Sequence, residues 1–385
     1  MPINYIREEL ERLKREGLYR KLRRVEGEQG PTLILDGREV LNLSSNNYLG
    51  LANHPALREA AKEAMDRYGC GSGASRLISG NMTLHLELEE KVAALKGTEA
   101  ALVFNSGYQA NIGIVSSLCG RQDAVFSDRL NHASIIDGAI LSGSKLFRFS
   151  HNDLGRLESI LKKERSRFKK GLIITETVFS MDGDKPPLKE LADLKDKYDC
   201  LLMVDEAHAT GIYGKSGSGM VEEYGLVNRV DLIMGTFGKA LGGFGAYLAS
   251  SKSMVDYLIN TCRSFIYSTS LPPAIAACDL AAIGLIKEEP HRRKKLLDLA
   301  RYFRDELKSM GLNVKGDSQI VPVMIGENGK TCEAAKKLQK RGYWILPIRP
   351  PTVAAGQARL RFSLTFNHDK EILQRLLKDI SDAGI

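Results

Sequence analysis

The stretch Asp231–Gly243 reads DLIMGTFGKALGG, in which a short apolar run leads directly into glycines that surround one lysine, Lys239. Similar apolar runs occur earlier, at 101–104 (ALVF), 124–126 (AVF), 172–174 (LII) and 201–204 (LLMV). Helical segments lie between most of them, and the last three runs begin 29 and 30 residues apart, at 172, 201 and 231. This period is typical of repeated βα units. The sequence therefore predicts an α/β fold with a mainly parallel central sheet and helices on both faces.

The flanking sequence predicts two smaller regions around this sheet. Towards the N-terminus, periodicity and turn signals predict a basic amphipathic helix over 5–24, a hairpin over 31–45 that turns at Asp36-Gly37, and helices over 54–69 and 83–97. After about residue 285, helices at 291–310 and 331–341 alternate with apolar runs at 320–325 and 343–348. We therefore expect an N-terminal segment over 1–45, a large domain over 46–285 and a small C-terminal α/β domain over 286–385.

Composition excludes several classes of protein. The chain of 385 residues is 43% hydrophobic, and no apolar run approaches the roughly 18 residues of a membrane span. We expect no membrane partner and a cytoplasmic location. Six cysteines are scattered without a C-x-x-C pair, which predicts buried thiols, no disulfide framework and no metal site. The net charge of +8 favours anionic partners such as nucleic acid, phosphorylated cofactors or coenzyme A, without choosing among them.

Polar residues follow each apolar run, at the end of each expected strand. They are Ser106, Gly107 and Tyr108 after the first run, His132 after the second, Ser180 after the third, Asp205 and His208 after the fourth, and Thr236 and Lys239 after the fifth. Ligands of open parallel sheets bind beyond the carboxyl ends of the strands. The sequence therefore predicts that these side chains meet at one edge of the sheet and form a binding site there.

Pyridoxal phosphate is a cofactor that needs this set of groups. It requires a lysine for its Schiff base, here Lys239, and a carboxylate for its ring nitrogen, here Asp205. Backbone N–H groups at a helix start bind its phosphate, which suits residues 106–108, and Thr236 can add a hydroxyl. His132 can lie flat against the ring. Each residue also has a simpler interpretation, since Asp205 favours helix caps, His132 can be a structural histidine and Ser180 can start a turn.

Two rival classes of protein lack their motifs. The tetrapeptide DEAH at 205–208 suggests a nucleic-acid-dependent ATPase, but no G-x-x-x-x-G-K-[ST] occurs in the chain. A dehydrogenase would need a G-x-G-x-x-G that follows a strand, whereas the glycine cluster at 69–80 follows a helix and lacks that spacing. We therefore expect no nucleic-acid partner.

Seven motifs resemble those of the α-oxoamine synthases. In chain order they are SSNNYLGLANHP, NHASIIDG, VFSMDGD, VDEAHATGIYG, GTFGKALGG, YSTSLPPA and IRPPTVAAGQARLR, and the likeness covers about residues 20–370. The resemblance implies a fold-type I pyridoxal phosphate transferase, built as a homodimer. Such enzymes condense an amino acid with an acyl-CoA and release carbon dioxide.

The resemblance also implies a role for each matching residue. Catalysis falls to Lys239, which binds the cofactor covalently, to Asp205 on the ring nitrogen, to His132 on the ring face and to His208. Ser180 lies with His208 near the phenolic oxygen. The phosphate is bound by Ser106, Gly107, Tyr108 and Thr236, with Ser268 and Thr269 from a partner chain. Substrate is bound by Arg20, Asn46, His132, Arg349 and Thr352, and Arg349 suits a bidentate grip on the amino-acid carboxylate.

The substrates are predicted from the motif that contains Arg349. IRPPTV…ARLR is similar to the family members that use L-alanine with pimeloyl-CoA or the corresponding acyl carrier-protein thioester. The alternative is the group of members that use glycine and acetyl-CoA, to which NHASIIDG and GKALGG are at least as similar.

Overall fold

The computed structural model describes residues 2–385 and divides the chain into two compact units. Unit 1 comprises residues 1–45, 181–183 and 296–385, and unit 2 comprises residues 46–180 and 184–295. The predicted boundary at residue 285 falls inside a helix, α11 (Pro273–Glu288), whereas the boundary between the two units lies at Lys295/Leu296. The division into functional domains over 1–45, 46–285 and 286–385 stays a prediction.

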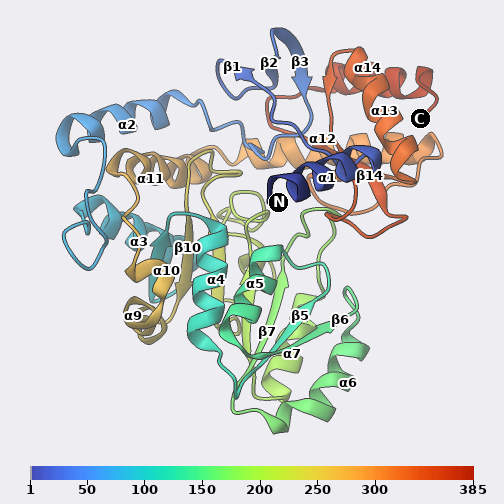
Figure 1. The fold of residues 1–385 in the computed structure, drawn as a ribbon. Helices are drawn as coiled ribbons and strands as arrows, with labels where there is room; N and C mark the ends of the chain where they lie inside the picture. Colours follow the sequence, from blue (N-terminus) through green and yellow to red (C-terminus); the bar gives the residue numbers. More distant parts are fainter. Residues whose placement is uncertain (1) are drawn as a thin grey trace. The chain divides into compact units, whose positions relative to one another are not determined.

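A seven-stranded sheet forms the centre of unit 2 (Figure 1). Its spatial order is β4-β10-β9-β8-β7-β5-β6, and only β10 runs antiparallel to its neighbours. The strands are β4 (Ala100–Phe104), β5 (Ala124–Asp128), β6 (Lys145–Phe149), β7 (Gly171–Glu176), β8 (Leu201–Asp205), β9 (Leu232–Thr236) and β10 (Ala246–Ser250). The prediction of a mainly parallel sheet is confirmed. Strands β6 and β10 were not predicted from the sequence.

Helices pack on both faces of this sheet. One face carries a continuous apolar core in which Ile114, Ile135 and Leu258, from α4, α5 and α9, pack with strand residues such as Met203. On the other face α3 packs against β10, and Lys96 lies over the Tyr247 ring. The helices of unit 2 are α2 (Pro55–Tyr68), α3 (Thr83–Lys96), α4 (Gly107–Leu118), α5 (Ala133–Ser142), α6 (Leu154–Glu164), η1 (Arg165–Arg167), α7 (Leu188–Lys197), α8 (Met220–Glu223), α9 (Lys252–Thr261), α10 (Arg263–Ile266) and α11.

Unit 1 joins the N-terminal hairpin to the C-terminal part of the chain. The predicted hairpin is present, because β2 (Thr32–Leu35) and β3 (Arg38–Asn42) pair around Asp36 and Gly37, whose φ values of 49° and 80° form the turn. Strand β3 also pairs with β12 (Tyr343–Trp344) in parallel. The remaining elements are α1 (Pro2–Arg15), β1 (Val25–Glu26), β11 (Ile320–Gly326), α13 (Asn328–Lys340), β13 (Pro347–Ile348), β14 (Ala358–Ser363) and α14 (Lys370–Asp382), while α12 (His291–Ser309) spans the boundary.

Two expectations from the sequence need correction. The predicted helix over 5–24 ends at Arg15, because Gly17 adopts a φ of 66° that breaks the helical path. The six thiols were expected to be buried, but Cys70 is exposed, Cys278 and Cys332 are partly exposed, and only Cys119, Cys200 and Cys262 are buried. Among the helices of residues 2–385, none is long and apolar enough to cross a membrane.

Candidate active site

The carboxyl ends of the parallel strands bring the predicted residues to one edge of the sheet in unit 2. Strands β5, β7, β8 and β9 pair in parallel, and β4 runs in the same direction, since β10 is antiparallel to both β4 and β9. His132 and Ser180 lie four residues past β5 and β7, whereas His208 and Lys239 lie three residues past β8 and β9. The clustering predicted from the sequence is therefore present in the fold.

Lys239 lies in a chain of polar contacts. Its Nζ is 2.9 Å from His208 Nε2, and His208 Nδ1 is 2.8 Å from the hydroxyl of Tyr48. The Tyr48 hydroxyl in turn donates to Asn46 Oδ1 at 3.1 Å. Tyr48 and His208 are both buried. Because one ring nitrogen faces Tyr48, the other is held towards the lysine amine. Tyr48 was not predicted as a site residue, although it lies within the quoted motif SSNNYLGLANHP.

A second chain of contacts joins Asp205 to His132. Asn111, in α4, donates from Nδ2 to Asp205 Oδ2 and to Ser134 Oγ, each at 3.0 Å. Ser134 Oγ lies 2.8 Å from His132 Nδ1. Asp205 Oδ1 also accepts the N–H of Ala207, so this carboxylate caps the following turn as well. Asn111 and Ser134, which the sequence did not single out, therefore orient two predicted cofactor contacts.

Desolvation sets the ionisation of two groups at this edge. It is the largest influence on His132, and together with the nearby positive charge of Lys239 it lowers the imidazole pKa although Asp205 opposes the shift. Desolvation also raises the pKa of the fully buried Glu176 to about 8, helped by the negative charge of Asp205. The backbone N–H groups of His132 and Ser180 face this carboxyl group and oppose its shift. Glu176 was not predicted as a site residue.

The start of α4 fits a phosphate group. Ser106 is the N-cap, and its Oγ accepts the N–H of Gln109 at 3.2 Å. A Cβ at Gly107 would lie 2.8 Å from Thr236 Cγ2, so glycine keeps this approach open. The buried hydroxyl of Thr236 has no hydrogen-bond partner among residues 2–385. A buried hydroxyl without a partner beside a helix N-terminus suits an anionic ligand. The residues present therefore fit pyridoxal phosphate.

Three further predicted residues lie around the same helix start. The Tyr108 ring meets the His132 ring edge-on, with centroids 6.2 Å apart, and its hydroxyl donates to Asp137. Gln109 donates to Ser268 Oγ at 2.7 Å, and Asn105 donates to the carbonyl of Thr269 at 2.8 Å. Within one chain Ser268 and Thr269 thus lie beside α4, and their expected contribution to a partner chain stays a prediction.

Three predicted substrate residues lie together in unit 1. Arg20 donates to Thr352 Oγ1 at 3.2 Å, and Arg349 donates to the carbonyl of Gly17. These contacts join the segment after α1 to the segment after β13, and the predicted substrate-binding role of the three residues stays a prediction. No group of three or more His, Cys, Asp or Glu side chains among residues 2–385 is arranged to hold a metal ion.

Comparison with known proteins identifies the class. The family model for aminotransferase class I and II matches residues 38–380, and the chain belongs to this family. The predicted fold-type I pyridoxal phosphate transferase fold is confirmed by serine palmitoyltransferase of Sphingomonas wittichii, which superposes with a TM-score of 0.92 at 31% identity. That match covers 100% of this chain and 96% of the other. A lysine-to-alanine variant of the S. paucimobilis serine palmitoyltransferase, solved with a bound pyridoxal phosphate–myriocin aldimine, gives the same TM-score.

Relatives with higher sequence identity share a single enzyme name. The chain is 53% identical to 8-amino-7-oxononanoate synthase of Geotalea daltonii, over 98% of this chain and 97% of the relative. It is 52% identical to the protein of that name from Geobacter sulfurreducens, with the same coverage. The solved 8-amino-7-oxononanoate synthase of Francisella tularensis superposes with a TM-score of 0.79 at 30% identity, over 89% of this chain and 97% of that one. The predictions of an α-oxoamine synthase, of an enzyme and of pyridoxal phosphate as its cofactor are confirmed.

Proposed function

We propose that the protein condenses L-alanine with a pimeloyl thioester, either pimeloyl-CoA or the acyl carrier-protein form, in biotin biosynthesis. The Cα–H bond of alanine breaks, a bond forms between Cα and the acyl carbon, and the thiol leaves. The Cα–carboxylate bond then breaks with loss of carbon dioxide, and a proton returns to Cα. The products are 8-amino-7-oxononanoate, carbon dioxide and the thiol. The observation that carries the proposal is a lysine amine 2.9 Å from a buried histidine, in a chain about half identical to synthases of this name.

Each site residue has a proposed contact with a particular part of the cofactor. Lys239 would hold it covalently, Asp205 would bind its ring nitrogen, and His132 would lie against its ring face. His208 and Ser180 would bind near its phenolic oxygen, while Ser106, Gly107, Tyr108 and Thr236 would bind its phosphate. The bound cofactor supplies an electron sink that stabilises negative charge on the Cα of the substrate. The phosphate group of the cofactor fits the positive end of α4, where the first backbone N–H groups of the helix are available to bind it.

Proton transfer falls to Lys239 and its neighbour. When substrate displaces the Lys239 amine, the amine is free to take the Cα proton, and a neutral amine is a suitable general base. His208 Nε2, 2.9 Å away, can share that proton. Tyr48 holds the opposite ring nitrogen at 2.8 Å, which limits His208 to one orientation. His132, whose imidazole pKa is lowered, is neutral and can pack on the ring without adding positive charge.

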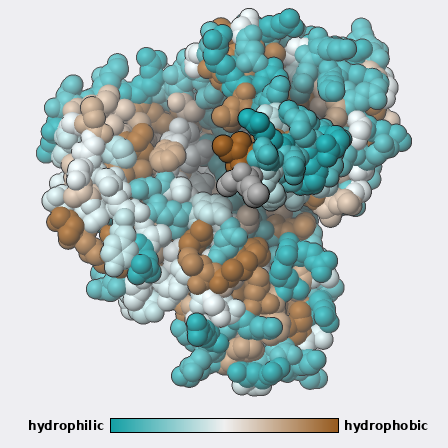
Figure 2. Space-filling model, in the orientation of Figure 1, coloured by the Kyte–Doolittle hydropathy of each residue, from teal (hydrophilic) through white to brown (hydrophobic). Residues whose placement is uncertain are grey.

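Substrate binding and assembly complete the proposal. Arg349 binds the amino-acid carboxylate, and Asn46, His132, Thr352 and Arg20 contact the substrates. A homodimer is supported by exposed apolar side chains on unit 2, including Ile140 and Leu141, each 67% exposed. Figure 2 shows hydrophobic residues gathered over the region of α4 and α5. In a dimer Ser268 and Thr269 would complete the partner's phosphate site. A cytoplasmic location stays a prediction.

An acyl-donor panel tests the substrates. Purified protein loaded with pyridoxal phosphate is given alanine or glycine with pimeloyl- or acetyl-CoA, and thiol release is followed. We expect alanine with the pimeloyl donor to be the best pair. The alternative activity is that of 2-amino-3-ketobutyrate CoA ligase. Faster thiol release with glycine and acetyl-CoA than with alanine and pimeloyl-CoA would favour this alternative and overturn the choice of substrates. Lys239→Ala, the control, should remain folded and release no thiol above background.

A further inference from the structure

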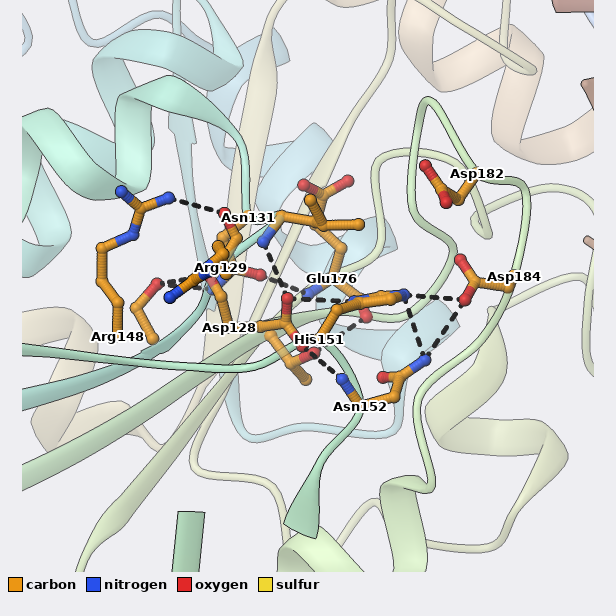
Figure 3. Close-up of polar contacts among 12 residues, drawn as sticks. Asp128, Arg129, Asn131, Arg148, His151, Asn152, Glu176, Asp182 and Asp184 are labelled. Carbon is orange, nitrogen blue, oxygen red and sulfur yellow. Dashed lines mark hydrogen bonds and ion pairs between the residues drawn. The ribbon is translucent and has the colours of Figure 1, made fainter. Parts of the chain in front are cut away.

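His151 lies just past the end of β6 and bridges two carboxylates. Its Nδ1 is 3.0 Å from Asp128 Oδ1, and its Nε2 is 2.7 Å from Asp184 Oδ2, as Figure 3 shows. Desolvation is the largest influence on its pKa and lowers it, but hydrogen bonds and ion pairs to both carboxylates outweigh burial and raise the pKa to about 10. The ring is therefore an imidazolium at neutral pH, and both of its N–H groups donate to carboxylates.

The two carboxylates belong to the segments that carry His132 and Ser180. Asp128 ends β5, and its Oδ1 also accepts the N–H of Leu130 at 2.8 Å, which shapes the turn before His132. Asp184 closes the loop around Ser180, because its carbonyl accepts the N–H of Phe179 at 3.0 Å. His151 thus joins the turn on one side of the site to the loop on the other.

Contacts around the ring limit its movement. The Phe179 ring packs against the His151 ring at 87°, with centroids 4.4 Å apart. The neighbouring Asn152 donates from its backbone to Asp128 Oδ2 at 2.9 Å and from Nδ2 to Asp184 Oδ2 at 3.3 Å. The same pair of carboxylates is therefore bound twice, by consecutive residues of one loop.

A second link joins the same two segments closer to the cofactor site. Asn131 donates from Nδ2 to the carbonyl of Ile174 at 2.8 Å and accepts the N–H of Glu176 at Oδ1, at 3.2 Å (Figure 3). The turn before His132 is thereby joined to the end of β7, four residues before Ser180. Two separate links leave little freedom in the spacing between His132 and Ser180.

We propose that His151 is a positioning residue of the reaction: by binding Asp128 and Asp184 at once, it fixes His132 relative to Ser180 and so sets the plane in which the cofactor ring is held. The inference rests on the proposed roles of His132 and Ser180. His151 forms and breaks no bond with substrate. A neutral side chain of similar size at position 151 cannot balance the negative charges of both carboxylates. Replacing His151 in this way leaves Asp128, only 1% exposed, without a charged partner.

His151→Gln tests the proposal, with His54→Asn as its matched control. His54 lies 3.9 Å from Glu289 in the same unit and caps α2, a role that Asn preserves. Four quantities are measured for each protein: cofactor affinity, visible circular dichroism per bound cofactor, thermal midpoint and steady-state kinetics. For His151→Gln we expect a changed visible dichroism and a kcat lower by about 10- to 100-fold, the effect of a small misplacement. KM for alanine should change much less. His54→Asn should keep the dichroism and kcat of the parent.

Asp184→Asn keeps an acceptor for His151 but removes one charge, and it decides the question if His151→Gln does not fold. It should shift the dichroism in the same direction by a smaller amount. A lower thermal midpoint with parental dichroism and kcat in these variants would reduce His151 to a purely structural role and overturn the proposal. The dichroism needs only bound pyridoxal phosphate. If the parent failed to condense alanine with a pimeloyl donor, the proposed function would be wrong, but the dichroism of parent and variants could still be compared.

Discussion

Lys96 Nζ lies 2.5 Å from Glu206 Oε2, and neither side chain is exposed to solvent. Lys96 also donates to Thr210 Oγ1 at 3.1 Å, and Glu206 Oε1 accepts the N–H of Val221 at 2.8 Å. Desolvation is the largest single influence on the Lys96 pKa and lowers it, but the charges and hydrogen bonds of Glu206 and Tyr247 together outweigh it and keep the pKa raised. The ion pair therefore anchors the segment that carries Asp205 and His208 to the end of α3.

Breaking this pair should destabilise the fold. In Glu206→Gln, Lys96 stays buried without a countercharge, and we expect the free energy of unfolding in urea to fall by about 3–5 kcal/mol. The double variant Lys96→Met/Glu206→Gln should lose less than the sum of its single variants. The exposed pair of Lys252 and Asp256 is the control, and Asp256→Asn should cost less than about 1 kcal/mol. Additive losses in the double variant would contradict a direct interaction.

Replacing Thr236 should separate cofactor binding from stability. Its hydroxyl is buried without a partner among residues 2–385, so Thr236→Val removes an unsatisfied group and should leave the thermal midpoint of the cofactor-free protein unchanged or higher. Hydrogen bonds to charged groups contribute about 1.5–3 kcal/mol, so the affinity for pyridoxal phosphate should fall roughly 10- to 100-fold. Fluorescence titration measures the affinity. Parental affinity in the variant would show that Thr236 does not bind the phosphate.

Removing the Tyr48 hydroxyl should affect catalysis more than folding. Tyr48→Phe leaves His208 Nδ1 without the partner that lies 2.8 Å away, so the ring loses the contact that orients Nε2 towards Lys239. We expect kcat to fall about tenfold and the stability to fall by only about 1 kcal/mol, a typical net hydrogen-bond contribution. Tyr198→Phe, which loses a 3.3 Å contact with Glu158, is the control. Equal kinetics in the two variants would remove Tyr48 from the proton pathway.

The raised pKa of Glu176 predicts a pH dependence of stability. The folded state holds its proton up to about pH 8, whereas the unfolded carboxyl ionises near its ordinary pKa of 4.5. Between these values the folded state binds more protons, so the free energy of unfolding decreases as pH rises from about 4.5 to 8. Glu176→Gln cannot ionise and should lose this slope, which makes it more stable than the parent at pH 8. Chemical unfolding of the cofactor-free proteins at several pH values measures the difference, and parallel curves would contradict the prediction.

The site residues that could be predicted lie directly after strands. Lys239, Asp205, His208 and His132 were found because apolar runs mark the strands, and the carboxyl ends of parallel strands share one edge of the sheet. Asn111 was missed because it lies within α4, where nothing in the local sequence marks it as facing Asp205. Tyr48 was missed because its contact with His208 joins positions 160 residues apart. Contacts of this kind depend on tertiary packing, which periodicity does not report.

The missed elements have similarly local causes. β6 (KLFRF) lies at the edge of the sheet, and its two charged residues interrupt the continuous apolar run that marks a buried strand. β10 (AYLAS) is fully buried, but its small residues carry little apolar signal. α1 ends at Arg15 although charged residues continue the helical pattern, because a single glycine with a positive φ decides the end.

The pairing of β3 with β12 has a consequence for synthesis on the ribosome. Tyr343 and Trp344, which align with Leu41 and Asn42, are made about 300 residues after them. Residues 46–295 contain a whole sheet and its helices, and can condense while the first 45 residues still have no neighbouring strand. The hairpin of β2 and β3 thus emerges long before the strand that completes its pairing, and a nascent chain halted before residue 343 would carry this hairpin with one edge open to other chains.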